Sequence, residues 1–240
     1  MNKLLKKALT ISTLIFTIGI LIPSASSTAY AENSPLYEKC KYEKTQQAGL
    51  KCAESEYNKL IKKNPKNEIL YGEMIFIYMQ VNQYDKALNI CNTGIKAVPN
   101  SYMLYNVLGT LQKDLGNDTA ALSAFNKSIE IEPTEPPYYN RARLYMAKEE
   151  YDKAISDYSM AIKYSATNPD AYKERAAAKF AKVASQNITG EEFKKIILSA
   201  YEDTDIALKQ YRESNNAEGY QQVLKFIETM NKIMKGEKPE

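Results

Sequence analysis

The residues of this chain that could do chemistry are its carboxylates and its three cysteines, because none of its 240 residues is histidine. Histidine is the usual general base of serine and cysteine hydrolases and the commonest metal ligand. Adjacent carboxylates occur at Glu149-Glu150 and Glu191-Glu192, but such pairs at helix starts and turns are typical of solvated charges that suit the helix dipole. The sequence has no glycine-rich phosphate loop, CxxC pair or acidic calcium loop. We therefore predict no enzyme, no metal site and no cofactor.

A repeat of small and aromatic side chains indicates the elements that position these residues. Four alanines recur at steps of 34, 34 and 33 residues, at Ala53, Ala87, Ala121 and Ala154. A tyrosine stands 16 residues before each of them, at Tyr37, Tyr71, Tyr105 and Tyr138. Three prolines keep the step of 34 residues, at Pro65, Pro99 and Pro133. A period of this length predicts stacked helical hairpins, which usually bind other molecules rather than transform them.

Apolar residues inside each period recur at the spacing of a helix. In the second period one stripe follows i, i+3, i+4 and i+7, with Tyr71, Met74, Ile75 and Tyr78. The second helix of this period ends before Pro99. The ladder alanines mark the places where two helices cross most closely, since a larger side chain there would push them apart at a cost of about 1–3 kcal/mol.

The third period resembles a known family, the tetratricopeptide repeats (TPRs). Their aromatic, Leu-Gly, Ala, Phe and Pro positions are matched by Tyr105, Leu108, Gly109, Ala121, Phe125 and Pro133. The resemblance covers most of residues 34–235 and implies an all-α, right-handed solenoid of about five antiparallel helical hairpins with a C-terminal capping helix. The implied units lie near residues 34–67, 68–101, 102–134, 135–168 and 169–216, followed by a cap at 217–235 and a flexible tail at 236–240.

The fifth period is longer than the others. Tyr172 reaches its alanine, Ala200, after 28 residues instead of 16. The additional residues divide around a turn at residues 185–190, so we predict that both helices of this hairpin are lengthened, by roughly three turns between them. This added surface has two interpretations, a tolerated insertion or a functional extension.

The first 31 residues are typical of a secretory signal peptide. Lys3, Lys6 and Lys7 precede an apolar run of 15 residues, from 8 to 22, and small residues follow it. The run is shorter than the roughly 20 apolar residues that span a bilayer core. We predict cleavage after Ala31 and an extracytoplasmic location, whether secreted, periplasmic or in the cell envelope. The mature chain would then keep no membrane span.

Cleavage also changes the charge of the chain. The precursor carries a formal net charge of +3, and loss of the three signal lysines would leave 29 basic residues, 32 less these three, against 29 acidic ones. A neutral mature chain has no basic excess to neutralise phosphates or anionic lipid headgroups. We therefore predict that nucleic acid is not a partner.

Export would bring the cysteines into an oxidising compartment, where disulfides form. Cys91 falls where the repeat expects a buried aromatic, so we predict that it is a small hydrophobic core residue. Cys40 and Cys52 flank a predicted turn. In a regular hairpin, residue 40 lies opposite residues 57–58, an offset from Cys52 of about five residues or ~7.5 Å, near the Cα limit for a disulfide. Regular geometry thus disfavours a Cys40–Cys52 bond, which an irregular first helix would permit.

The resemblance also implies where a partner would bind, because the first helices of TPR solenoids line a concave groove for peptides or partner helices. The corresponding residues mix apolar and polar side chains: Tyr42, Phe76, Met79, Met103, Asn106, Thr110, Lys113, Tyr139, Arg143 and Met146. Part of this set also suits packing between neighbouring first helices. Some family members grip a terminal carboxylate with Lys, Asn and Arg, but Glu174 stands where such an Arg is needed. We predict a protein or peptide partner.

Three functions remain open at this point. The first is an exported interaction module or scaffold that binds a polypeptide in the groove. The second is a self-associating structural component of an envelope assembly, built on the lengthened fifth hairpin; the oligomeric state is open. The third and most remote is a glycan-processing enzyme, which requires two carboxylates that converge across a cleft.

Overall fold

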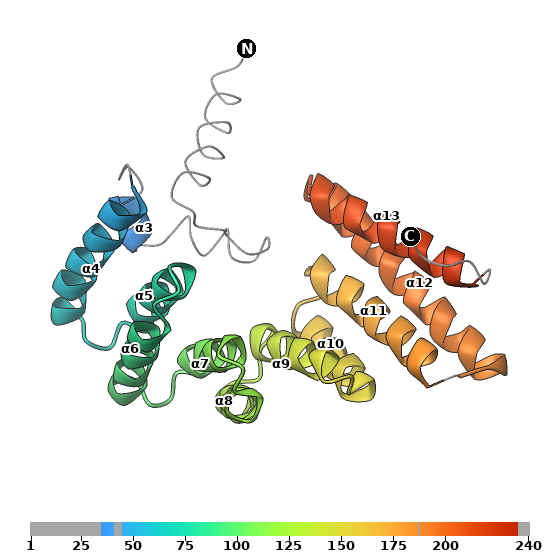
Figure 1. The fold of residues 1–240 in the computed structure, drawn as a ribbon, viewed down its shortest axis with the longest axis horizontal. Coiled ribbons are helices and arrows are strands. Elements are labelled where there is room, and N and C mark those ends of the chain that lie inside the picture. The colour runs from blue at the N-terminus through green and yellow to red at the C-terminus, as the bar shows by residue number, and fades with distance from the viewer. Residues whose placement is uncertain (1–34, 41–44, 187, 235–240) are drawn as a thin grey trace, which may run out of the picture. The chain divides into compact units, whose positions relative to one another are not determined.

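The computed structural model describes residues 35–40, 45–186 and 188–234, and the elements within these ranges are α-helices (Figure 1). This confirms the predicted all-α class. The predicted signal peptide at residues 1–31, the tail at residues 236–240 and the groove residue Tyr42 lie outside the described residues. None of the described helices has the length and apolarity needed to span a bilayer.

The helices divide into two compact units, with the division after Ile131. The first unit holds three hairpins: α3 (Pro35–Cys40) with α4 (Gln46–Lys63), α5 (Glu68–Gln80) with α6 (Tyr84–Ala97), and α7 (Tyr102–Asp114) with α8 (Asp118–Ile131). The second holds α9 (Glu135–Ala147) with α10 (Tyr151–Tyr164), α11 (Pro169–Ser185) with α12 (Gly190–Glu213), and the closing helix α13 (Ala217–Met234).

Three of the first helices start with a local side-chain cap, and three end in the same turn. The side chains of Asn67, Ser101 and Asn168 accept a backbone N–H at the starts of α5, α7 and α11, which satisfies donors that the helix itself leaves unpaired. After α5, α7 and α9 the chain passes through a left-handed residue, at Asn82 (φ 57°), Gly116 (φ 77°) and Glu149 (φ 58°). The N–H that follows each one bonds back to the helix, so the three hairpins close with the same Schellman turn.

Glu149 is the unfavourable residue in this set of turns. The left-handed conformation costs a residue with a side chain roughly 1–2 kcal/mol. Glycine avoids this cost, but it loses more conformational freedom on folding, which offsets part of the gain in stability. We expect Glu149→Gly to raise the free energy of unfolding by about 0.5–1 kcal/mol in urea titrations. Gly116→Ala should lower it by about 1 kcal/mol. Equal or lower stability of the Glu149→Gly variant would contradict the turn assignment.

The ladder alanines lie in the core, as close helix crossings require. Ala53, Ala87, Ala121, Ala154 and Ala200 are all buried. Glycine performs the same role where a helix meets an aromatic ring: a Cβ on Gly109 would lie 2.4 Å from the ring of Phe125. In the fifth hairpin, α11 has 17 residues and α12 has 24, against 13 and 14 in α9 and α10. Both helices are lengthened, and most of the addition is in α12.

Cys40 and Cys52 form a disulfide, with their Cα atoms 5.8 Å apart. The expectation against this bond, drawn from a regular hairpin, is wrong. Helix α3 has only six residues and ends at Cys40, so the two cysteines do not lie on a pair of full antiparallel helices. Leu36 anchors α3 in the core of the first unit, where Cys91 is also fully buried, as predicted. Burial raises the pKa of the Cys91 thiol to about 12.

Candidate functional site

In the first unit, the predicted groove residues lie on α5 and α7, two first helices that pack side by side (Figure 1). Phe76 and Met79 are on α5, and α7 carries the rest of the set: Met103, Asn106, Thr110 and Lys113. All six side chains are half-buried. The structure thus brings this part of the predicted set together on one pair of adjacent helices.

Several of these side chains are already engaged within the unit. Met79 packs against the core of the unit. The Thr110 hydroxyl donates to the backbone oxygen of Asn106 at 3.2 Å, and Lys113 lies 3.4 Å from Asp114. Phe76 is half-buried and does not belong to the described cluster of residues that forms this core. Phe76 is therefore the aromatic residue on this face best suited to anchor a partner.

In the second unit, the predicted residues Tyr139, Arg143 and Met146 lie on α9. The Tyr139 ring meets the ring of Tyr158 edge to face, with centroids 5.7 Å apart. Met146 packs against the same cluster. Arg143 is exposed to solvent. This part of the set is therefore partly core and partly surface.

The electrostatic environment of Tyr139 shows which charged groups surround it. Burial raises the pKa of the Tyr139 hydroxyl, and the carboxylates of Glu174, Asp170 and Glu135 raise it further, while Arg143 acts in the opposite direction. These carboxylates come from both first helices of the unit, α9 and α11. Three carboxylates thus act electrostatically on the Tyr139 hydroxyl.

Two of the three carboxylates are held by hydrogen bonds. Asn168, the residue that caps α11, donates its side-chain amide to Glu135 Oε1 at 2.6 Å. Burial raises the pKa of Glu135, and this hydrogen bond opposes the rise. Asp170 Oδ1 accepts from Lys173 Nζ at 2.9 Å and from the Tyr211 hydroxyl at 2.6 Å. These two carboxylates are therefore positioned by Asn168 and by side chains of α11 and α12.

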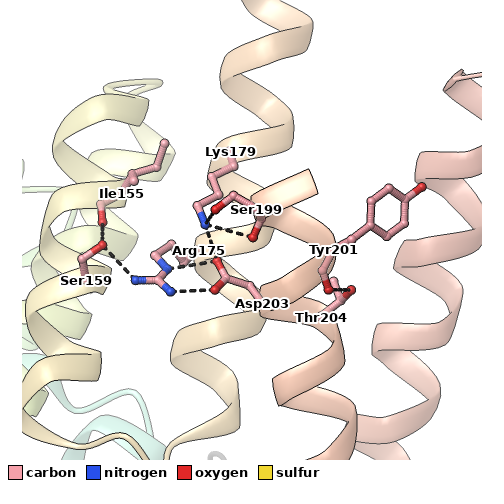
Figure 2. Close-up of polar contacts among 8 residues, drawn as sticks. All are labelled: Ile155, Ser159, Arg175, Lys179, Ser199, Tyr201, Asp203 and Thr204. Carbon is pink, nitrogen blue, oxygen red and sulfur yellow. Dashed lines mark hydrogen bonds and ion pairs between the residues drawn. The ribbon is translucent and has the colours of Figure 1, made fainter. Parts of the chain in front are cut away.

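An ion network centred on the buried Asp203, which the sequence analysis missed, joins helices of the second unit (Figure 2). Arg175 binds Asp203 through two parallel hydrogen bonds of 2.9 and 2.6 Å, and Lys179 Nζ reaches the same carboxylate at 2.7 Å. Lys179 also donates to Ser199, and Arg175 donates to Ser159 of α10. The network ties α11 to α10 and α12.

A second ion pair occupies the same place in the preceding hairpin. Arg141 binds Asp157 through hydrogen bonds of 2.7 and 2.8 Å. Arg141 and Arg175 each stand three residues after a leading tyrosine, and Asp157 and Asp203 each stand three residues after a ladder alanine. The third hairpin has Leu108 at the arginine position and Ala124 at the aspartate position. This register is visible in the sequence and could have revealed both pairs. Each arginine binds its aspartate through two hydrogen bonds across the hairpin, so the role of these pairs is to hold hairpins together.

A search for metal ligands among the described residues finds no group of three or more Cys, Asp or Glu side chains that could hold an ion.

The repeated hairpins define a helical-repeat protein. Residues 104–135 match the family described as tetratricopeptide repeat, and residues 142–183 match that described as TPR repeat. The chain therefore contains tetratricopeptide repeats in these two segments. No curated protein sequence matches the chain.

Solved structures of other repeat proteins share the fold. The chain is similar to MamA (20% identity, 71% of this chain and 91% of MamA covered, TM-score 0.53). It is also similar to PilW, a widely conserved type IV pilus biogenesis factor (18% identity, 87% and 94% covered, TM-score 0.53). A thermophilic TPR protein of Thermus thermophilus is a third example (17% identity, 77% and 89% covered, TM-score 0.51). At these identities the likeness shows a TPR-like fold.

Proposed function

We propose that this protein is an exported interaction module that binds a polypeptide through the first-helix faces of its repeats. The observation that carries the proposal is Phe76, a half-buried aromatic side chain of α5 that lies outside the core cluster of the first unit, on a helix that packs beside α7. Aromatic residues in such settings are the usual anchors of protein interfaces, and truncating one costs about 2 kcal/mol or more of binding free energy.

A photocrosslinking residue at position 76 tests this proposal in cells that produce the protein. We expect it to form an adduct with a discrete polypeptide, whereas the same residue at Leu224, an exposed apolar position on α13, should not. A second crosslinker position, 103 on the same face, measures the effect of the Phe76→Glu change. This change should reduce the adduct at least tenfold while the helical circular dichroism stays unchanged. Leu224→Glu is the matched control and should leave the adduct intact. Equal adducts from positions 76 and 224 would contradict the groove assignment.

Export is part of the proposal and is supported by two observations. The first residues have the order of a signal peptide, with lysines, a short apolar run and small residues. The Cys40–Cys52 disulfide is of a kind that persists in oxidising compartments and is rare in the cytosol. N-terminal sequencing of the protein from cells should find a chain that begins at Glu32. An intact Met1 terminus on the accumulated protein would overturn this part.

Self-association is a second candidate, favoured by the exposed apolar side chains of the lengthened α12. Leu198 is 64% exposed and Ile206, two turns further along the same helix, is 38% exposed. Sedimentation equilibrium at tens of micromolar separates the candidates. A species larger than the monomer that Leu198→Glu dissociates would favour assembly, and a monomer at all concentrations would exclude it.

A further inference from the structure

One face of α4, the second helix of the first hairpin, carries lysines and no carboxylate. The exposed residues of α4 between positions 51 and 63 are four lysines and two uncharged polar residues: Lys51, Ser55, Asn58, Lys59, Lys62 and Lys63. Positions 59, 62 and 63 follow the i, i+3, i+4 spacing of neighbours on a helix, and position 51 precedes position 62 by three turns. These six residues form the lysine face of α4, which extends over ~18 Å.

The two carboxylates of α4 do not neutralise this face. Glu54 is engaged by the neighbouring helices, because it accepts hydrogen bonds from the Tyr78 hydroxyl at 2.8 Å and from Lys86 at 3.1 Å. Glu56 lies 3.5 Å from Lys59, a contact of the exposed kind that contributes little. In the part of the chain that the structure describes, the other three lysines of the face enter no ion pair. Four lysines against one carboxylate leave three positive charges uncompensated.

The helix dipole explains only part of this arrangement. Lysines in the last turn of a helix interact favourably with its dipole, which accounts for Lys62 and Lys63. Lys51 lies three turns earlier, beyond the reach of this effect. The neutrality predicted for the mature chain as a whole does not extend to this region, because residues 57–67 hold four lysines and no acidic residue. A basic helix face of this kind is typical of contact with an anionic surface.

We propose that the lysine face of α4 docks on the anionic headgroups of a lipid bilayer. Its long, flexible side chains stand on the convex surface of a helix, which suits a diffuse layer of charge better than a shaped ligand. Beyond the end of α4, Lys66 adds a further exposed charge, and Ile69 is 46% exposed. A bilayer surface accepts both ammonium groups and an adjacent apolar side chain. Each lysine near such a surface strengthens binding about fivefold.

This docking leaves the proposed polypeptide site free. The lysine face belongs to a second helix, whereas Phe76 lies on the first helix α5. An exported protein would thus be held at a membrane surface while its first-helix faces stay available to a partner. The inference does not rest on polypeptide binding, and the two are tested separately.

The experiment is sedimentation of the purified protein with sucrose-loaded vesicles of phosphatidylcholine that contain one third phosphatidylglycerol. We expect half of the protein to sediment at millimolar lipid in low salt, and binding at least tenfold weaker in high salt, which screens the charges. Vesicles of phosphatidylcholine alone should not bind the protein. No sedimentation with the anionic vesicles, or equal sedimentation with both kinds, would overturn the proposal.

Two variants with the same net charge locate the contact. The first neutralises the lysine face: Lys51→Gln, Lys59→Gln, Lys62→Gln and Lys63→Gln. The second neutralises four exposed lysines of the second unit: Lys163→Gln, Lys195→Gln, Lys209→Gln and Lys225→Gln. Glutamine keeps the helix propensity of lysine, so the circular dichroism of both should match that of the parent protein. We expect the first variant to bind at least fiftyfold more weakly, and the second to change less than threefold. Equal losses would show that overall charge, and not this face, determines binding.

Two further measurements separate a bilayer from other anionic partners. Acetylation of lysines, read by mass spectrometry, should show that anionic vesicles protect the lysine face and leave the four lysines of the second variant reactive. Poly-glutamate is the soluble competitor, and tighter binding of it than of vesicles at equal charge would assign the face to an acidic polypeptide instead. Crosslinking at position 76 reports polypeptide binding independently, so either result can fail while the other stands.

Discussion

Replacing Asp203 with alanine is expected to lower the free energy of unfolding of the second unit by about 3–5 kcal/mol, the usual cost of breaking a buried ion pair from one side. The Asp203 side chain is only 3% exposed, and it is the counterion of both Arg175 (19%) and Lys179 (12%). Without it, two poorly solvated cations face each other with no anion between them. Urea titration monitored by circular dichroism measures the effect, since the chain has no tryptophan.

Two further variants make this result specific. Asp205→Ala removes an exposed aspartate from the same helix and should change stability by less than about 0.5 kcal/mol. The triple variant Arg175→Met, Lys179→Met and Asp203→Leu removes every charge of the network. It should recover most of the lost stability, because apolar side chains of similar volume often replace a buried ion network at little cost. Equal effects of Asp203→Ala and Asp205→Ala would show that the network contributes nothing to stability.

Reduction of the Cys40–Cys52 disulfide is expected to destabilise the packing of α3 by about 3 kcal/mol, the loop-closure contribution for a sequence separation of 12 residues. Helix α3 has six residues, too few to persist without packing, and Leu36 is its fully buried anchor. Dithiothreitol should therefore increase hydrogen exchange at residues 35–40 and lower the urea midpoint of the first unit.

The double variant Cys40→Ser and Cys52→Ser provides the control. It should match the reduced protein and should no longer respond to dithiothreitol. The remaining thiol, Cys91, is fully buried and has a raised pKa, so it should resist alkylation until the protein unfolds. Full helical protection of residues 35–40 in the double variant would show that packing alone holds α3.

The helices and their closest contacts were predictable because the repeat places small residues at crossings and aromatic residues beside them. The disulfide could not be predicted in this way, because its geometry depends on where α3 ends. The periodicity of the repeat carries no information on an irregular terminal helix. The ion pairs were missed because carboxylates were sought next to each other in the sequence. Arg141 and Asp157 are 16 residues apart and become partners only through the register of the hairpin.

The candidate site divides in a similar way. Repeat register identified the side of each first helix that Phe76 and Tyr139 occupy. It could not determine how far each side chain is used by its neighbours, as Met79 and Met146 show by packing against the cores of their units. Tyr158 is fully buried in the core of the second unit. Whether a buried hydroxyl finds a partner depends on three helices at once, which no local pattern encodes.

The arginine–aspartate pairs also bear on how an array of similar hairpins avoids assembling incorrectly during folding. Near-identical repeats can exchange partners, so that the first helix of one docks on the second helix of another. If α9 docked on α8, Arg141 would meet the position of Ala124 and remain buried without a counterion. If α7 docked on α10, Asp157 would meet Leu108 in the same way. The ion pairs thus label the two hairpins of the second unit and penalise their exchange with α7 and α8.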